Sequence, residues 1–366
     1  MKEYKICNRC VMDNSSDTKI VFDVNGCCNY CTSALEEINT TTYFPNEVGG
    51  KKLEEKLKEI KNNGVGKEYD CIMGISGGLD SSYLAYLGCK WGLRILAVHI
   101  DDGFDTEISK NNIEKLVNTC GINLIVVKPD PVQYYDLTKA YLKAGVPNIA
   151  VPQDNILFAY LYELVKKYKL KYFLSGGNFA LESILQQDHV YNAYDVVNIK
   201  DIHKKFGTQP INKLKFISSY KKYLDMKLFG IETPRLLNFI DYNRERAFKE
   251  LKEFCGFEYY GGKHLENIFT AFAQLYWFPK KFGVDKRRSH LSSMIVSGQI
   301  GRDTALEELE RPMYDELVMR EYFEIIKEKL GLTDCEFEHI LNSSPHNHSD
   351  YAVDRLGMWI RKIFFR

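Results

Sequence analysis

Apolar positions in the middle of the chain fall into short runs separated by longer amphipathic stretches. The short runs cover residues 70–75, 94–100, 122–128, 171–175 and 234–240. Runs of this length between turn-forming residues are typical of buried parallel strands. Helical periodicity marks the stretches between them, at 83–91, 106–120, 154–168 and 243–255. Strands that alternate with helices predict an α/β fold with a doubly wound parallel sheet, here of five strands, whose ligands bind beyond the carboxyl ends of the strands.

The pattern changes at both ends of the chain. Helical periodicity dominates after residue 257, in segments 264–278, 287–298, 303–310, 313–330 and 333–341. Before residue 46 the chain is polar and rich in cysteine. We therefore expect three units: a small cysteine-rich unit at 1–45, an α/β domain at 46–258 and a helical region at 259–366. The basic, amphipathic tail at 356–366 is predicted to form a helix that caps the core, and contact with a membrane or a partner is the alternative.

Composition indicates an ordinary globular protein and argues against a nucleic-acid partner. Hydrophobic residues make up 45% of the chain, and 49 basic residues balance 49 acidic ones. Proteins that bind a nucleic-acid backbone usually carry a basic excess instead. The start of the chain lacks the apolar core of a secretory signal, and no apolar run is long enough to span a membrane. We expect a cytoplasmic protein without a membrane span, whose cysteines hold metal or are thiols.

Four cysteines near the start have the spacing of a metal site. Cys7 and Cys10 form one Cys-x-x-Cys knuckle, and Cys28 and Cys31 form a second. Each knuckle can present two thiolates to a tetrahedral centre, which predicts a structural zinc ribbon with all four ligand positions filled. A pair of disulfides and an iron–sulfur cluster are the alternatives. Cys27 does not fit the knuckle geometry and is expected to be a free thiol.

The segment after the first predicted strand has the features of an anion-binding loop. It reads Ser76-Gly77-Gly78-Leu79-Asp80-Ser81-Ser82 and leads into a helix. A glycine turn at a helix start directs backbone N–H groups at one point, and the serine hydroxyls add donors. It is not a Walker A loop, because Asp80 stands where that motif needs lysine. The loop resembles the PP-loop of ATP pyrophosphatases, which holds pyrophosphate while the α-phosphate reacts. A glycine-rich turn without a ligand is the alternative.

Polar residues follow two other predicted strands, at the edge where the PP-loop would lie. Asp101 and Asp102 end the second strand. Gly176, Gly177 and Asn178 follow the fourth, with Glu182 one turn later. We interpret Asp101 as a candidate ligand of the nucleotide or magnesium. Asn178 and Glu182 would orient the metal or the bond that breaks. Taken singly, each acid is equally consistent with a solvated loop.

Two later clusters combine ionisable residues with glycine. The first contains Lys263, His264 and Glu266 beside two glycines. The second contains Lys286 and Arg287 in a Gly-Val-Asp-Lys-Arg turn before a predicted helix. Cations in such a turn can hold phosphates, so we expect these two residues to bind the triphosphate. A solvated charge run is the alternative.

These motifs, in this order, resemble the bacterial N-acetyl sugar amidotransferase family over nearly the whole chain. The resemblance rests on the cysteine knuckles, the PP-loop, 101–103 with 111–113, 151–154, 176–178, 261–264 and 285–292. The last two blocks distinguish the family from other PP-loop enzymes. Cys27 and Phe104 depart from the family pattern.

The resemblance implies an ATP-dependent reaction that installs an acetamidino group on a bacterial surface or flagellin sugar, such as pseudaminic acid or a diacetamido-uronic sugar. ATP and Mg²⁺ bind at the PP-loop, the acetamido oxygen takes AMP from ATP, and ammonia then displaces AMP. The residues implied for catalysis are Asp80, Asp154, Asn178, Glu182, Lys263, His264 and Glu266. Those implied for cofactor binding are Ser76, Gly77, Gly78, Asp80, Ser81, Ser82, Asp101, Gly176, Gly177, Lys286 and Arg287.

Two other functions fit parts of the pattern. A tRNA thiolase of the PP-loop group can also join zinc knuckles to this loop, but it needs a sulfur-carrying cysteine or a cluster. A non-catalytic nucleotide-binding protein could use the same sheet, although the acids at two strand ends disfavour it. No stretch is left for a glutaminase domain, so ammonia is expected from solution or from a separate glutaminase partner.

Overall fold

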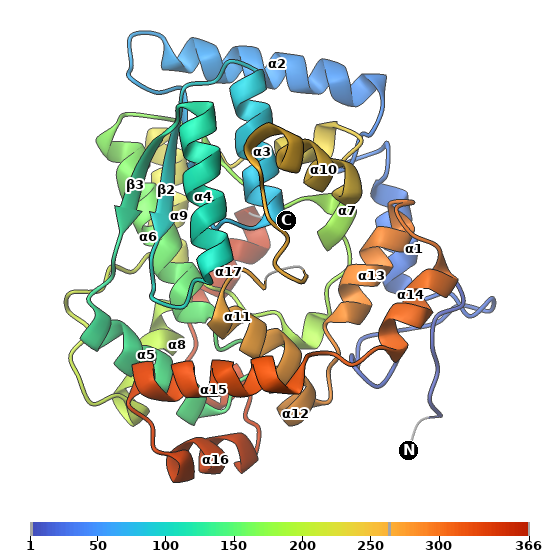
Figure 1. Ribbon diagram of the computed structural model, residues 1–366, viewed down its shortest axis with the longest axis vertical. Helices are drawn as coiled ribbons and strands as arrows, with labels where there is room; N and C mark the ends of the chain where they lie inside the picture. Colours follow the sequence, from blue (N-terminus) through green and yellow to red (C-terminus); the bar gives the residue numbers. More distant parts are fainter. Residues whose placement is uncertain (1–2, 263–264, 365–366) are drawn as a thin grey trace.

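A four-stranded parallel sheet forms the centre of the protein in the computed structural model, which describes residues 3–262 and 265–364. The strands are β1 (Cys71–Gly74), β2 (Ile95–Ile100), β3 (Asn123–Val127) and β4 (Phe173–Leu174). Their order is β3-β2-β1-β4, and every pair is parallel. The chain therefore winds from β1 outward to β3 and then returns to the other side of β1. Figure 1 shows the neighbouring strands β2 and β3 of this sheet. This confirms the predicted doubly wound α/β class, with four strands instead of five.

The predicted fifth strand is wrong, because Pro234 ends the pairing before a strand forms. Glu232 lies beside Tyr172 in an isolated parallel bridge, where its carbonyl accepts from the N–H of Phe173 at 2.9 Å. The Pro234 carbonyl still accepts from Ser175, but proline has no N–H to continue a ladder. The apolar residues that follow form the 3₁₀ helix Leu236–Phe239 instead, and Leu236 and Leu237 are buried in it.

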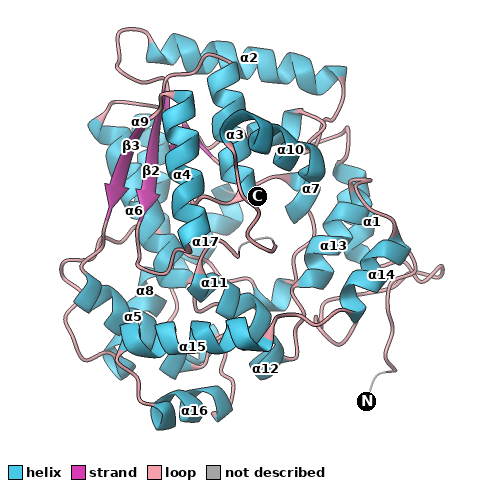
Figure 2. Cartoon of the chain, in the orientation of Figure 1, coloured by secondary structure: helices cyan, strands magenta, loops and turns pink. Residues whose placement is uncertain are grey.

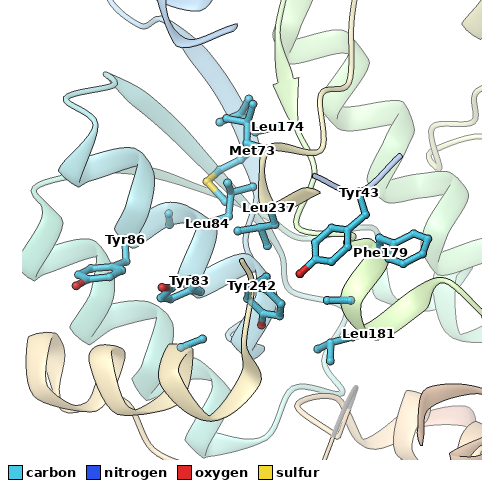
Figure 3. Packing of buried hydrophobic residues seen from close by; sticks show 14 of the residues in the cluster. Tyr43, Met73, Tyr83, Leu84, Tyr86, Leu174, Phe179, Leu181, Leu237 and Tyr242 are labelled. Carbon is cyan, nitrogen blue, oxygen red and sulfur yellow. The ribbon is translucent and has the colours of Figure 1, made fainter. Parts of the chain in front are cut away.

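Helices lie on both faces of the sheet (Figure 2), and alternate residues of the strands pack against them. Met73 and Ala97 face α3 (Leu79–Lys90), α4 (Glu107–Cys120) and α10 (Arg244–Cys255). Ile72 and Val98 face α6 (Val151–Lys167). This period of two is what a strand buried on both sides requires. Figure 3 shows Met73 and Leu174 of the sheet above the tyrosines Tyr83 and Tyr242.

Further helices surround this core. Those before residue 260 are α1 (Asn29–Glu37), α2 (Glu47–Gly64), α5 (Pro131–Ala144), α7 (Phe179–Glu182), the 3₁₀ turn Gln187–His189, α8 (Val196–Phe206) and α9 (Ser219–Phe229). Those after it are α11 (Ile268–Phe272), α12 (Phe278–Phe282), α13 (Arg287–Val296), α14 (Arg302–Glu310), α15 (Glu316–Leu330), α16 (Asp334–Asn342), a 3₁₀ turn at His348–Asp350 and α17 (Arg355–Phe364). No helix in the described part of the chain is long and apolar enough to cross a membrane.

The predicted helix at 264–278 begins later and is not regular. Asn267 starts α11, because its side chain accepts a hydrogen bond from the Thr270 N–H. A π-helical turn at Ala273–Trp277 then joins α11 to α12. Such turns often occur at functional sites, and this one lies beside the cavity described below. The boundaries proposed at residues 45 and 258 stay predictions.

Candidate nucleotide and substrate site

The PP-loop connects β1 to α3 in a conformation that needs glycine. Gly77 has a φ of +76°, and a Cβ there would lie 2.3 Å from the carbonyl oxygen of Ser109. A side chain would therefore clash with α4 and strain the backbone. Gly78 is the N-cap of α3 and makes no side-chain cap. Since no side chain caps the helix start, an anion could take that place.

Serine hydroxyls line the loop as predicted. The Oγ atoms of Ser76 and Ser81 lie 3.3 Å apart, and the Gly78 N–H donates to Ser76 Oγ at 3.3 Å. Ser82 is fully buried, and its Oγ has no hydrogen-bond partner among the described residues. A buried hydroxyl without a partner is costly, which is consistent with a ligand or water completing the loop.

The loops after β1 and β4 meet at the point where the strand order reverses. A Cβ at Gly176 would lie 3.0 Å from the backbone nitrogen of Ser81, so only glycine permits this approach. Asp80, in the first turn of α3, accepts a 2.5 Å hydrogen bond at Oδ1 from the buried hydroxyl of Tyr242. Ligands of doubly wound sheets bind at such a reversal. The predicted loop residues therefore surround one crevice.

A cavity of about 520 Å³ opens from this crevice toward the helical region. Six of the predicted site residues line it: Ser76, Ser81, Asp154, Gly176, Glu266 and Lys286. A second cavity of about 640 Å³ contains Glu182 and Arg287 and shares Lys286 and Gln274 with the first. Asp80 lines a third, aromatic cavity of about 270 Å³. Segments that are far apart in the sequence therefore lie close together around the PP-loop.

Glu266 extends a carboxylate directly to the PP-loop. Its Oε1 accepts from Ser76 Oγ at 3.1 Å and lies 2.5 Å from where a Gly78 Cβ would be. Its Oε2 is buried and has no hydrogen-bond partner among the described residues. A carboxylate beside an anion-binding loop is expected to need a cation between them, and oxygen ligands of this kind suit Mg²⁺.

Asp154 and Lys286 both line this cavity, and both have shifted pKa values. Burial raises the pKa of the Asp154 carboxyl to about 6. Burial also lowers the pKa of the Lys286 ammonium to about 8, partly offset by the nearby Asp17 carboxylate. The Lys286 ammonium lies 5.0 Å from the ring of Phe278, and no ion pair reaches it within residues 3–262 and 265–364. Buried charges with shifted pKa values in a cavity are typical of functional sites.

Several predicted residues are engaged elsewhere. Asp101 forms an ion pair with Lys128 at 2.8 Å and lines none of these cavities, so its proposed contact with nucleotide or magnesium is not supported. The Arg287 guanidinium bonds to Asp285, to the carbonyl of Glu308 in α14 and to the carbonyl of Arg311 just after that helix. These contacts engage the Arg287 guanidinium, which we expected to bind the triphosphate.

The remaining candidates are placed near the crevice without lining it. Asn178 is buried as the N-cap of α7, where its Oδ1 accepts from the Leu181 N–H at 3.0 Å. It therefore supports the loop after β4 and does not face a ligand. Gly177 lies beside it, close to the Glu182 carboxylate. Lys263 and His264 lie outside the described residues.

A buried histidine that sequence reasoning missed lies directly under the PP-loop. His99 Nδ1 is 2.9 Å from the carbonyl oxygen of Ile75, and Nε2 is 3.0 Å from Asp105 Oδ2. Both neighbours accept hydrogen bonds, so both ring nitrogens donate and the ring is an imidazolium. Burial alone would lower the pKa of His99, but Asp105 and the carbonyl outweigh burial and raise it. A signal existed: His99 is the one histidine within the four strands.

Asp102, just after β2, connects several segments around the cavity. It is buried and accepts hydrogen bonds from Gln153 at 2.6 Å, from Tyr134 at 3.2 Å and from Asn267 at 3.1 Å. Burial and the neighbouring Asp105 raise the pKa of Asp102 to about 6. Because Asn267 starts α11 and Gln153 lies in α6, this carboxylate ties both walls of the cavity to the end of β2.

The four predicted cysteines form one cluster. The Sγ atoms of Cys7, Cys10, Cys28 and Cys31 all lie within 4.8 Å of one another, and all four residues are buried. The Cys28 N–H points at Cys7 Sγ at 3.2 Å, as backbone donors do toward metal-bound thiolates. Four thiols in two Cys-x-x-Cys knuckles fit tetrahedral zinc. Cys27 lies outside the cluster, as expected.

The cysteine unit is attached to the cavity wall. Arg288 of α13 pairs with Asp13 at 2.9 Å, and Arg302 of α14 donates to the carbonyl of Cys7 at 3.0 Å. Asp17 accepts a 2.6 Å hydrogen bond from the N–H of Gln187, two residues before the cavity residue His189. The cysteine unit therefore holds both segments, 187–189 and 286–292, that border the cavity.

Comparisons with known proteins match two parts of the chain. Residues 266–363 match the family model described as "LPS biosynthesis protein WbpG-like, C-terminal domain". A 92-residue segment is 36% identical to "GMP synthase [glutamine-hydrolyzing]" of Thermus thermophilus, covering 25% of this chain and 16% of the relative. The enzyme of the same description from Dictyostelium discoideum is 26% identical over 142 residues, 38% of this chain and 17% of its own length. The chain thus covers about a sixth of these curated relatives.

Solved structures give weaker similarity. The NMN synthetase from Francisella tularensis aligns with 58% of this chain and 93% of its own, at 16% identity and a TM-score of 0.30. The NH₃-dependent NAD synthetase from Campylobacter jejuni aligns with 78% of this chain and 97% of its own, at 15% identity and a TM-score of 0.31. The PP-loop after β1, the GMP synthase segment and the C-terminal match together support the resemblance seen in the sequence, to a PP-loop ATP pyrophosphatase of LPS sugar biosynthesis.

Proposed function

We propose that this protein is an ATP-dependent amidotransferase that converts the N-acetyl group of a bacterial surface or flagellin sugar into an acetamidino group. The observation that carries the proposal is the cavity of about 520 Å³ that joins the PP-loop to polar residues of the C-terminal region. Its lining includes Ser76 and Ser81 of the PP-loop, which suit a nucleotide. It also includes amide and hydroxyl side chains that suit a sugar, from Asn148, Gln153, Thr270 and Gln274.

The reaction balances in two steps. The acetamido carbonyl oxygen attacks the α-phosphorus of ATP, the bond from that phosphorus to the bridging oxygen breaks, and pyrophosphate leaves. Ammonia then adds to the imidate carbon, and AMP leaves with the original carbonyl oxygen. Adenylation is needed because an amide carbon is a poor electrophile and its oxygen a poor leaving group. Loop amides and hydroxyls would stabilise charge on the pyrophosphate.

The side chains suggest a division of roles. Asp80, within the PP-loop, and Glu266, which accepts from Ser76, are the carboxylates that would hold Mg²⁺, which supplies positive charge for the triphosphate. Lys286 would bind an anionic group of the substrates. Asp154 or Glu266 could accept the proton that ammonia loses, as could His264. The His99 imidazolium would hold the loop carbonyl of Ile75 in place from below.

The tRNA thiolase alternative lacks a candidate sulfur carrier in the site. Among the described residues that line the three cavities around the loop, no cysteine occurs. Cys71 is buried inside β1, where burial raises the pKa of its thiol far above the usual range. A thiolate at that position would be unavailable. The amidotransferase therefore remains the better proposal.

The defining experiment follows the oxygen and nitrogen atoms. We expect purified protein, given ATP, Mg²⁺ and ¹⁵N-ammonium, to release pyrophosphate only with certain N-acetylated sugars and to place ¹⁵N in the product. A sugar labelled with ¹⁸O in its acetyl carbonyl should transfer that label to AMP. Label that stays in the sugar, or pyrophosphate release that ignores the sugar, would contradict the proposed chemistry.

Ammonia supply makes a second prediction. Free ammonia, not ammonium, is the nucleophile, so the rate at fixed total ammonium should rise with pH around neutrality. Glutamine should not replace ammonium, because we propose that a separate glutaminase delivers ammonia in the cell. Adding that partner should restore glutamine use. Glutamine-dependent turnover by the purified chain alone, with contaminating glutaminase excluded, would show that the proposed partner is not needed.

Lys286 makes a third prediction, measured by nucleotide binding without turnover. Lys286→Met keeps the aliphatic volume and removes the charge, so ATP affinity should fall about tenfold or more, the value of one charge-assisted hydrogen bond. In the wild type, affinity should also fall as pH rises through about 8, because Lys286 then loses its proton. Lys280→Met, at an exposed neighbour, is the matched control. Equal ATP affinity in both variants would return Lys286 to a structural role.

A further inference from the structure

The C-terminal helix presents a large apolar face instead of capping the core. Trp359 is 58% exposed, Leu356 is 58% exposed and Ile363 is 49% exposed. At about 100° per residue these three side chains lie within about 60° of one another around α17. The prediction that the tail caps the core is therefore wrong for this face. Single exposed apolar residues are common, but a stripe of three on one helix needs an explanation.

This helix is fixed to the rest of the protein. Asp354, just before α17, receives the Gly357 N–H at 2.8 Å and donates its own N–H to Asp195 at 3.0 Å. Gly357 is buried, and a Cβ there would lie 2.9 Å from the Cβ of Ser219 in α9. The backbone of α17 thus packs closely on α9 through its glycine side. Its opposite side, with Trp359, is held outward.

The two packed helices are strongly basic in a chain whose net charge is zero. Together α9 and α17 contain six basic residues and one acid: Lys221, Lys222, Lys227, Arg355, Arg361 and Lys362 against Asp225. Asp225 is buried and already paired with Lys166 at 2.7 Å. Arg355 and Lys362 are exposed beside the apolar stripe of α17. The α9 helix adds exposed Tyr220, Leu228 and Phe229.

We propose that the α9–α17 pair is a docking surface for an anionic membrane. An apolar stripe that carries tryptophan and is flanked by lysine and arginine is the pattern of helices that lie in the lipid headgroup region. The apolar side chains enter the boundary with the acyl chains, and the basic side chains attract anionic headgroups. The charge complementarity favours this occupant over a second copy of the chain, because two such basic faces would repel each other.

The experiment is flotation of the full-length protein with lipid vesicles. One set is phosphatidylcholine, and the other contains about 30% phosphatidylglycerol to supply anionic headgroups. We expect binding to the anionic vesicles, and at least about a tenfold weaker partition at high salt, because salt screens headgroup attraction. Emission from Trp359 should shift to the blue on binding. Trp359→Phe should abolish that shift while preserving flotation, since Trp277 is buried and Trp91 lies at the end of α3, outside the proposed surface.

Variants distinguish binding through the α9–α17 surface from non-specific adsorption to vesicles. Trp359→Ser with Ile363→Ser should reduce the bound fraction at least about fivefold and leave the melting temperature unchanged, because both side chains are exposed. Leu317→Ser is the matched control, at a residue of α15 that is 71% exposed. Equal binding to both kinds of vesicle, or no binding to either, would overturn the proposal. A dimer that Ile363→Ser breaks, without vesicle binding, would instead identify a self-association face and also overturn it.

Discussion

Asp80→Asn should reduce pyrophosphate release by about a hundredfold or more while the protein stays folded. The proposed role of this carboxylate is to hold magnesium against the triphosphate, and loss of such transition-state stabilisation typically costs this much. The change should leave the fold intact. Asn keeps an oxygen that can accept the hydrogen bond from the Tyr242 hydroxyl. Gly78, not Asp80, is the N-cap of α3, so the lost attraction of an acid to a helix start costs about 0.3–1 kcal/mol. Thermal melting and steady-state rates measured on the same preparation would compare the two effects.

Tyr242→Phe provides the matched control for this prediction. The Tyr242 hydroxyl donates to Asp80 Oδ1 at 2.5 Å and is buried, so its removal leaves the charge and loses only the orientation of the carboxylate. We expect a loss of activity smaller than that of Asp80→Asn. If Asp80→Asn turns over within tenfold of wild type, Asp80 is a structural residue and the proposed loop chemistry is wrong.

The parts of the fold that the sequence predicted depend on local signals. The PP-loop is one, because a positive φ at Gly77 and the helix start at Leu79 follow from neighbouring residues. The cysteine cluster is another, since each knuckle places two thiols by its own spacing. Four of the strands followed from apolar runs. Pro234 was the local signal against the fifth, and the apolar run around it outweighed proline in the prediction.

The contacts that could not be predicted depend on partners that are distant in sequence. Nothing near Arg287 shows that its guanidinium meets the carbonyl of Glu308, and nothing near Asp101 shows that Lys128 pairs with it. The contact of His99 with the Ile75 carbonyl joins two strands, and only the parallel register of β1 and β2 brings them together. A sequence therefore shows which side chains carry charge, but it does not show which distant residue will pair with each of them.

The last prediction concerns folding and the four-cysteine cluster, which we expect to hold zinc. Cys28→Ser should lose bound zinc and most soluble protein together. A ribbon this small has little core of its own, and structural zinc supplies about 10–16 kcal/mol in comparable small sites. The loss should also reach the candidate site, because Asp17 holds Gln187 and Asp13 holds Arg288 beside the cavity.

Cys27→Ser is the matched control, because Cys27 is adjacent to Cys28 and lies outside the cluster. It should keep zinc, solubility and activity, whereas each of the four cluster positions should behave like Cys28. Metal analysis of the folded, reduced wild type is expected to give about one zinc per chain, as a filled Cys₄ site requires. A content below about half of that would count against the ribbon. Visible absorbance from bound iron would indicate that the four cysteines hold an iron–sulfur cluster and not zinc. That result would favour the thiolase alternative.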